Sequence, residues 1–146
     1  MADVFTKAKR SEVMSLIRSR GNMATELRLV KLFRAHGITG WRRHVALKHS
    51  GSGVPFSVRP DFLFRAERVT VFVDGCFWHG CPKHGTRPRG NAEFWKQKIE
   101  RNQARDRLVS RKLRALGWRV LRIWEHELQR KNEGRCLRRV ARALGE

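Results

Sequence analysis

The period of the hydrophobic positions changes several times along the chain, and each change predicts a different element. Apolar residues recur at helical spacing in some segments, whereas others are short runs rich in β-branched and aromatic residues. Gly37 and Gly117 follow two of the helical segments, where glycine commonly ends a helix. We expect helices over 8–19, 24–36, 93–116 and 134–144, and strands over 41–47, 58–64, 69–73 and 118–124.

The connections between these elements predict a mixed α/β domain over residues 1–146. Residues 65–68 form a tight turn between two strands, which are therefore expected to pair as a hairpin. The last strand follows a long helix, so it is expected to join the sheet by a right-handed crossover. Residues 48–55 predict a flexible loop, and a loop rich in cysteine and histidine runs over 75–90.

Composition narrows the class of protein. The chain has 146 residues, 33 Lys and Arg against 13 Asp and Glu, and a formal net charge of +20, while five Trp and eight Phe supply apolar mass for a core. Such a charge indicates a polyanionic partner, most simply nucleic acid, although a solvated basic surface without a partner is the alternative. No apolar run approaches the roughly 20 residues that span a bilayer, and the first ten residues lack a secretory signal, so we expect no membrane association.

Two acids stand out among so many basic residues. Asp61 lies inside the predicted strand 58–64, flanked by apolar residues, and Asp74 ends the following strand. If these strands pair around the 65–68 turn, both carboxylates approach the same end of the sheet, where they could hold a hard divalent cation such as Mg²⁺. The equally weighted alternative is that Asp61 pairs with an arginine and that Asp74 only caps a turn.

The Pro60-Asp61 step, followed by a strand and a second acid, resembles the restriction-endonuclease-like nuclease fold. That fold places a mixed central sheet between flanking helices. Its usual acid and lysine two residues apart are absent here, because Thr70, Val71 and Phe72 occupy that place. Another group must therefore complete such a site.

Cysteine usage indicates a metal site rather than a disulfide framework. Cys76 and Cys81 lie close together, with His79 between them and His84 just beyond. The third cysteine, Cys136, lies in an arginine-rich helical segment and is expected to be an ordinary helix residue. An odd number of cysteines without a secretory signal argues against structural disulfides.

A specific string surrounds these cysteines and is accompanied by further segments. DGCFWHGCPKH occupies 74–84, and NAEFWKQKI and GWRVLRIWE follow at 91–99 and 117–125. Shorter segments are Lys9-Arg10-Ser11 with Met14, Thr25-Glu26, Asn102 and Arg105-Asp106. Over residues 7–128, in order and without large gaps, the chain resembles the very short patch repair (Vsr) endonucleases. The resemblance implies an enzyme that nicks DNA 5′ of the thymine in a T:G mismatch, a lesion that deamination of 5-methylcytosine leaves.

The resemblance also implies catalytic roles. Asp61 would bridge catalytic magnesium ions, His79 would be the general base for the attacking water, and Glu26 would hold metal-bound water. A surface loop histidine is the alternative for His79. The best-known family member carries histidine at the position of Asp74, so here this residue would ligate the metal or orient water instead.

A structural zinc site is implied as well. Cys76, Cys81 and His84 would supply three ligands of a tetrahedral site. The fourth family ligand is usually a cysteine after the Trp-Glu pair, where this chain has His126. Histidine is an acceptable zinc ligand, so we expect a site with two cysteines and two histidines; the alternative is a solvent-facing His126 and an incomplete site.

DNA-contacting residues follow from the same resemblance. Phe77 and Trp78 would wedge into the duplex beside the mismatch, with Met14 entering from the other groove side, although Phe77 could instead pack in the core. Lys9 and Arg10 belong to an N-terminal DNA-contacting helix within residues 1–20. The remaining large aromatics have helix or strand periodicity and are expected in the core: Phe94, Trp95, Trp118 and Trp124.

These inferences combine into one expected function. The chain is expected to be a monomeric, Mg²⁺-dependent mismatch endonuclease with structural Zn²⁺, cytoplasmic and associated with the bacterial nucleoid. A repair polymerase and a ligase would act after it, and a cytosine-5 methyltransferase would be functionally linked to it. The alternatives are a catalytically inactive, zinc-stabilised DNA-binding module, which the intact Asp61 and His79 disfavour, and a restriction-like nuclease on matched DNA, which the Phe77-Trp78 wedge disfavours.

Overall fold

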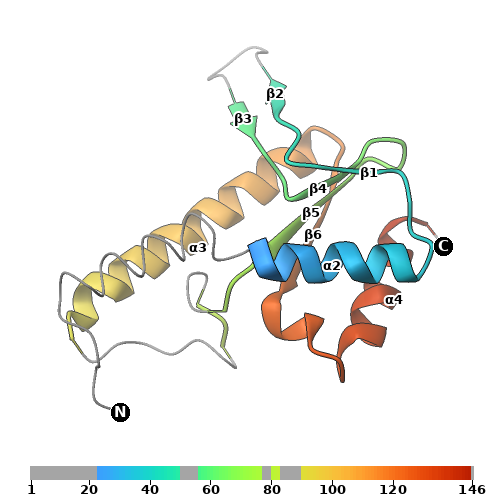
Figure 1. Cartoon of the computed structure of the whole chain (residues 1–146). Helices are drawn as coiled ribbons and strands as arrows, with labels where there is room; N and C mark the ends of the chain where they lie inside the picture. The colour runs from blue at the N-terminus through green and yellow to red at the C-terminus, as the bar shows by residue number, and fades with distance from the viewer. Residues whose placement is uncertain (1–22, 50–55, 77–79, 83–89, 146) are drawn as a thin grey trace.

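The computed structural model describes residues 23–49, 56–76, 80–82 and 90–145 (Figure 1). The helix predicted over 8–19 lies outside these residues. The described helices are α2 (Met23–Ala35), α3 (Ala92–Ala115), the short 3-10 helix η1 (Glu125–Leu128) and α4 (Glu133–Ala143). The strands are β1 (Trp41–Arg43), β2 (Leu47–His49), β3 (Phe56–Val58), β4 (Phe62–Phe64), β5 (Val69–Asp74) and β6 (Arg119–Trp124).

The central sheet is mixed and has the strand order β1-β4-β5-β6. Strand β4 pairs antiparallel with β1 and β5, so the hairpin predicted around 65–68 is confirmed. Strand β6 returns after α3 and pairs parallel with β5, from Val69 opposite Arg119 to Asp74 opposite Trp124. The expected mixed sheet with flanking helices is therefore confirmed. Strands β2 and β3 form a separate two-stranded ribbon.

Two of the predicted strands are each broken into two, which corrects the sequence-based boundaries. The strand expected over 41–47 ends at Arg43, because His44 adopts a left-handed backbone with φ of 54°. The strand expected over 58–64 is interrupted at Pro60, which cannot donate to a sheet ladder. The loop expected over 48–55 is also too long, since residues 48 and 49 pair with β3 in the ribbon.

The main core lies between the sheet and the two helices α2 and α4. Phe33 of α2 packs edge-on against Phe62 and Phe64 of β4, with ring centroids 5.3 and 5.8 Å apart. Alternate residues of β5 join the same cluster, as do Cys136 and Val140 of α4. Helix α3 covers the opposite side of the sheet (Figure 1). One face of the sheet therefore forms the main core with α2 and α4, and the other face packs against α3.

The aromatic residues expected in the core divide into two groups. Trp95 is buried, as predicted, but Phe94 is 56% exposed, so that prediction was wrong. Trp118 is partly exposed beneath the Arg68 guanidinium, and Trp124 is partly buried against His126. Both lie at strand β6 or beside it, and neither is fully buried. Among the described helices, none has the length and hydropathy to cross a bilayer.

Candidate active site and cysteine cluster

Asp61 lies at the end of the sheet where β4 begins. It follows Pro60, so its backbone has left the β3 pairing and its carboxylate turns toward β5. The Val73 backbone N–H donates to Asp61 Oδ2 at 2.7 Å. This bond fixes the carboxylate beside the last residues of β5, as the sequence predicted for a hairpin that brings two acids to one end.

Glu26 meets Asp61 from the first turn of α2. Its side chain is buried, and one oxygen, Oε2, accepts from Arg43 Nη2 at 2.7 Å and contacts His44 Nε2 at 2.8 Å. One carboxylate oxygen of Glu26 and one of Asp61 lie within 4.8 Å of each other. A carboxylate in the first turn is favoured by the positive end of the helix dipole.

The pKa values of the Asp61 and Glu26 carboxyl groups are shifted in opposite directions. Burial raises the pKa of Asp61 to about 7, and the neighbouring Glu26 and Asp74 carboxylates raise it as well, against the Val73 N–H, which lowers it. Burial would also raise the pKa of Glu26, but its hydrogen bonds with Asp61, Arg43 and His44 lower it overall. Between the lowered pKa of Glu26 and about pH 7, the proton of the pair therefore lies on Asp61 and the charge on Glu26 in the metal-free protein.

Glu26, His44 and Asp61 each offer a ligand atom, and these atoms lie within 4.8 Å of one another. Two converging carboxylates are the donors that Mg²⁺ prefers, so this cluster fits a divalent cation. His44 and Arg43 were not predicted. Their stretch has the pattern of a strand, and only the left-handed backbone at His44 turns its ring toward Glu26.

Asp74 is buried on the face of the sheet that carries α3. It accepts from Arg122 Nη1 at 3.1 and 3.3 Å, and Arg122 also approaches Asp106. Asp74 is not part of the Glu26–His44–Asp61 cluster, although its charge raises the pKa of Asp61. Metal ligation by Asp74 stays a prediction.

Several predicted site residues lie outside the described part of the chain. The general base, one zinc ligand and all the proposed DNA contacts belong to this group: His79, His84, Lys9, Arg10, Met14, Phe77 and Trp78.

Cys76, Cys81 and His126 form a second cluster, which begins two residues after Asp74. Both sulfurs face His126 Nδ1, at 3.4 Å from Cys76 Sγ and 3.5 Å from Cys81 Sγ. Zinc–sulfur bonds of about 2.3 Å and zinc–nitrogen bonds of about 2.0 Å at a tetrahedral angle separate sulfur and nitrogen by about 3.5 Å. The donor set and its spacing therefore fit a zinc ion.

The surroundings of this cluster hold its members in place. The Cys81 N–H donates to the Cys76 carbonyl at 2.9 Å, and the Cys76 N–H donates to Glu125 Oε1 at 2.8 Å. The His126 ring stacks on Trp124. Burial raises the pKa of the Cys76 thiol to about 12, with Cys81 and Glu125 adding to the effect. A divalent cation is the partner that would let these thiols ionise.

Gly80 packs closely against side chains of α3. Its φ is +64°, and a Cβ there would lie 2.8 Å from Ile99 Cγ2 and 2.5 Å from Gln103 Nε2. We expect Gly80→Ala to lower the free energy of unfolding by about 1–3 kcal/mol, from backbone strain plus this overlap.

Urea unfolding monitored by circular dichroism measures this effect. Gly37→Ala is the matched control, because Gly37 has a similar φ of +67° but nothing within 4 Å of the added Cβ. Equal losses of stability in the two variants would mean that the contact with α3 is unimportant.

Comparison with known proteins finds similarity to mismatch endonucleases and nicking enzymes. A model of the family "DNA mismatch endonuclease Vsr" matches residues 2–84. The chain is 39% identical over 144 residues to the type II nicking enzyme V.NmeDIP of Neisseria meningitidis serogroup C, covering 97% of this chain and 90% of that protein. It is 38% identical over 130 residues to the DNA mismatch endonuclease Vsr of Escherichia coli, covering 88% and 77%.

A further relative matches only in part. The type II nicking enzyme V.NaeI of Lentzea aerocolonigenes is 54% identical over 77 residues, which are 53% of this chain and 45% of that protein. The match thus spans less than half the length of that relative.

Proposed function

The chain belongs to the DNA mismatch endonuclease Vsr family, and from this premise we propose that it nicks one strand of duplex DNA 5′ of the thymine in a T:G mismatch, in a Mg²⁺-dependent reaction. The observation that carries the proposal is the Asp61–Glu26 carboxyl pair, fixed at one end of the sheet by Val73, Arg43 and His44. The fold is then of the restriction-endonuclease-like type, in which Arg43 and His44 contact Glu26 beside Asp61.

In this proposal each residue has a distinct role. Asp61 holds Mg²⁺, with Asp74 as a further candidate, and Glu26 holds metal-bound water. Bound magnesium supplies positive charge against the charge that develops on the scissile phosphodiester. Arg43 and His44 keep Glu26 ionised and oriented, so that it can accept a hydrogen bond from the attacking water. His79 accepts the proton of that water, for which an imidazole near its ordinary pKa is suited.

The remaining parts of the proposal concern structure and partners. Cys76, Cys81 and His126 hold a structural Zn²⁺, with His84 as the fourth ligand. Phe77, Trp78 and Met14 wedge into the duplex, and an N-terminal helix within residues 1–20, with Lys9 and Arg10, contacts DNA. The enzyme acts as a monomer in the bacterial cytoplasm, upstream of a repair polymerase and a ligase. Its mismatches arise where a cytosine-5 methyltransferase has acted.

The pKa of Asp61 makes Mg²⁺ binding depend on pH. Because its pKa is raised to about 7, the carboxyl must release a proton before it can bind a cation. We therefore expect the apparent Kd for Mg²⁺ to increase by up to about tenfold for each pH unit below about 7 and to level off above it. Calorimetric titration in buffers of different ionisation enthalpy measures both the Kd and the released proton. An affinity that is constant across this range would contradict the assignment.

The proposed function is tested by incubating the protein with end-labelled duplexes and resolving the products on a denaturing gel. One duplex carries a single T:G mismatch, and a control carries T:A at the same position. A nick in the T strand of the mismatched duplex, in Mg²⁺ but not in EDTA, supports the proposal. Cleavage of both duplexes would favour a nuclease for matched DNA, and binding without any nick would indicate an inactive DNA-binding module.

A further inference from the structure

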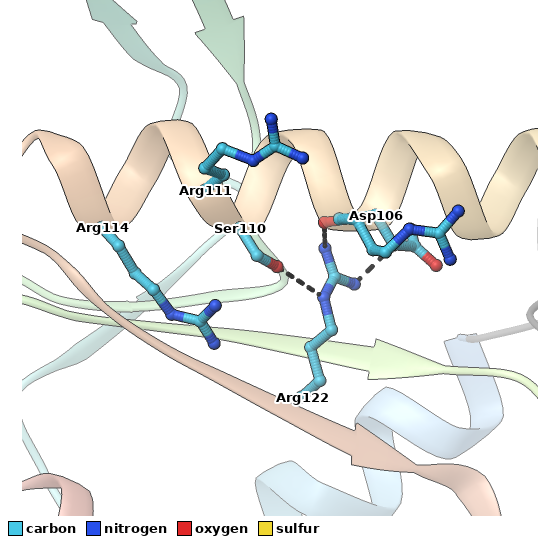
Figure 2. Close-up of a pocket in the computed structure, with 6 residues that line it drawn as sticks. Asp106, Ser110, Arg111, Arg114 and Arg122 are labelled. Carbon is cyan, nitrogen blue, oxygen red and sulfur yellow. Dashed lines mark hydrogen bonds and ion pairs between the residues drawn. The ribbon is translucent and has the colours of Figure 1, made fainter.

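A basic hollow outside the carboxylate cluster lies between the C-terminal half of α3 and strand β6. Its volume is about 480 Å³, and it opens to solvent. Four guanidinium groups and one carboxylate line it, together with a serine hydroxyl (Figure 2): Asp106, Arg107, Ser110, Arg111, Arg114 and Arg122. No residue of the Asp61 cluster or of the cysteine cluster is among them.

Arg122 forms a fixed floor for this hollow. It rises from β6 to α3, where Nε donates to Ser110 Oγ at 3.0 Å and Nη2 donates to the Asp106 carbonyl at 3.2 Å. Figure 2 shows this side chain between Asp106 and Arg114. Its other nitrogen is occupied by Asp74, so the floor is held in position before any ligand arrives.

The wall of the hollow consists of three exposed arginines, Arg107, Arg111 and Arg114. Spacings of three and four residues place neighbouring members on one side of the helix. Within the described part of the chain, no carboxylate lies within 4.0 Å of their guanidinium nitrogens. Like charges at these spacings repel one another, so the arrangement disfavours the free helix and favours a bound polyanion.

We propose that this hollow is a phosphate-binding site that takes backbone phosphates of the DNA outside the cleaved step, an inference that rests on the proposed function. The seven-residue span of the wall is about 10 Å long. A wall of that length can contact more than one phosphate of a strand. Guanidinium groups suit this role because they bind phosphate oxygens in a bidentate manner.

The position of the floor favours DNA over a free anion as the occupant. Arg122 touches Asp74, the last residue of β5, and the Val73 N–H next to it holds Asp61. The hollow and the carboxylate cluster are therefore connected through consecutive residues of one strand. Because α2 and α3 lie on opposite faces of the sheet, a duplex engaged at Asp61 reaches the hollow where it extends past the end of β5 onto the α3 face.

The test measures the salt dependence of DNA binding. The first variant replaces the wall by glutamine (Arg107→Gln, Arg111→Gln and Arg114→Gln). The matched control removes three exposed arginines from α4 (Arg135→Gln, Arg138→Gln and Arg142→Gln), which leaves the same net charge. The Kd for a metal-free T:G duplex is determined by fluorescence anisotropy across a KCl series. Thermal unfolding confirms that both variants fold.

We expect the slope of log K against log salt to fall by about 2–3 in the wall variant and to change little in the control. Substituting lysine for the three wall arginines should restore the slope, since the charge is retained. Equal slopes for wild type and wall variant would overturn the proposal, as would an equal decrease in both glutamine variants.

Two further measurements distinguish DNA from free phosphate as the ligand, and the phosphate site from the proposed nicking activity. Stabilisation of the wild type by inorganic phosphate that is lost in the wall variant, without a change in the DNA slope, would identify a free anion as the ligand and overturn the assignment to DNA. Nicking by the wild type is measured in parallel with Mg²⁺. A decreased slope without nicking supports the phosphate site and contradicts the proposed activity, whereas nicking with an unchanged slope contradicts the site alone.

Discussion

An Asp61→Asn variant is expected to lose nicking by about a thousandfold or more and yet to be more stable than the wild type in metal-free buffer at alkaline pH. The lost activity follows because an amide is a poor ligand for a divalent cation whose charge contributes several kcal/mol to transition-state stabilisation. The gain in stability follows from the pKa of Asp61, which is raised to about 7 in the folded protein. A single substitution therefore separates function from stability.

The sign of the stability effect can be worked out from this pKa. The unfolded chain releases the Asp61 proton near pH 4, whereas the folded protein retains it until about pH 7. The contribution of protonated Asp61 to stability is fully present below about pH 4 and is lost as the pH rises through about 7. Above that pH, ionised Asp61 faces the charges of Glu26 and Asp74. Asparagine removes this repulsion, which we expect to be worth on the order of 2 kcal/mol.

Thermal unfolding in Mg²⁺-free buffer without a chelator, at several pH values, measures this effect while leaving the proposed zinc in place, and Asp74→Asn is the matched control. The control makes the same change in shape, but it removes the partner of the Arg122 guanidinium and should lower the melting temperature. Nicking and Kd for the mismatched duplex are determined for the same samples. Retained nicking in Asp61→Asn, or a melting temperature below that of the wild type, would contradict the assignment.

Removing the zinc proposed for the cysteine cluster is expected to have the largest effect on stability. Structural zinc contributes its binding free energy directly to folding, so a strong chelator should lower the free energy of unfolding by several kcal/mol. Cys81→Ser should have a similar effect, because it removes one of the two sulfurs that face His126. The variant should then be insensitive to the chelator, since its site is already incomplete.

Cys136→Ala is the control for this experiment. Cys136 is fully buried in α4, within the main core and not in the metal cluster. Its substitution should cost only the loss of packing, about 1 kcal/mol, and leave sensitivity to the chelator intact. Metal analysis of the purified protein should find zinc in the wild type and in this control but not in Cys81→Ser. A wild type that contains no zinc and ignores chelators would contradict the structural role.

The sequence predicted those parts of the fold and site that depend on periodicity and short spacing. The long helix over Ala92–Ala115 and strand β5 follow from uninterrupted apolar patterns. Asp61 was found because a tight turn between two strands brings acids at their ends together. The pairing of Cys76 and Cys81 with His126 could be expected only through the family resemblance, since His126 is far along the chain.

The features that escaped prediction depend on backbone geometry or on contacts between distant elements. The left-handed backbone of His44 interrupts the strand. The Arg-Arg-His sequence contains no residue type that would predict this turn. Arg122 resembles an ordinary outward-facing strand residue, yet it is held by α3 on one side and by Asp74 on the other. Phe94 shares the helical spacing of a core residue but lies on the exposed side of α3.

The central claim is most directly tested by mapping nicks on a pool of duplexes that carry one T:G mismatch within randomised flanking bases. The pool is incubated with Mg²⁺ and either wild-type protein or Asp61→Asn, and the ends of the products are sequenced on both strands. We predict nicks by the wild type only, confined to the 5′ side of the mismatched thymine, in a subset of flanks that defines the sequence context. Nicks on matched control duplexes, or at scattered positions, or equal cleavage by Asp61→Asn, would contradict the account.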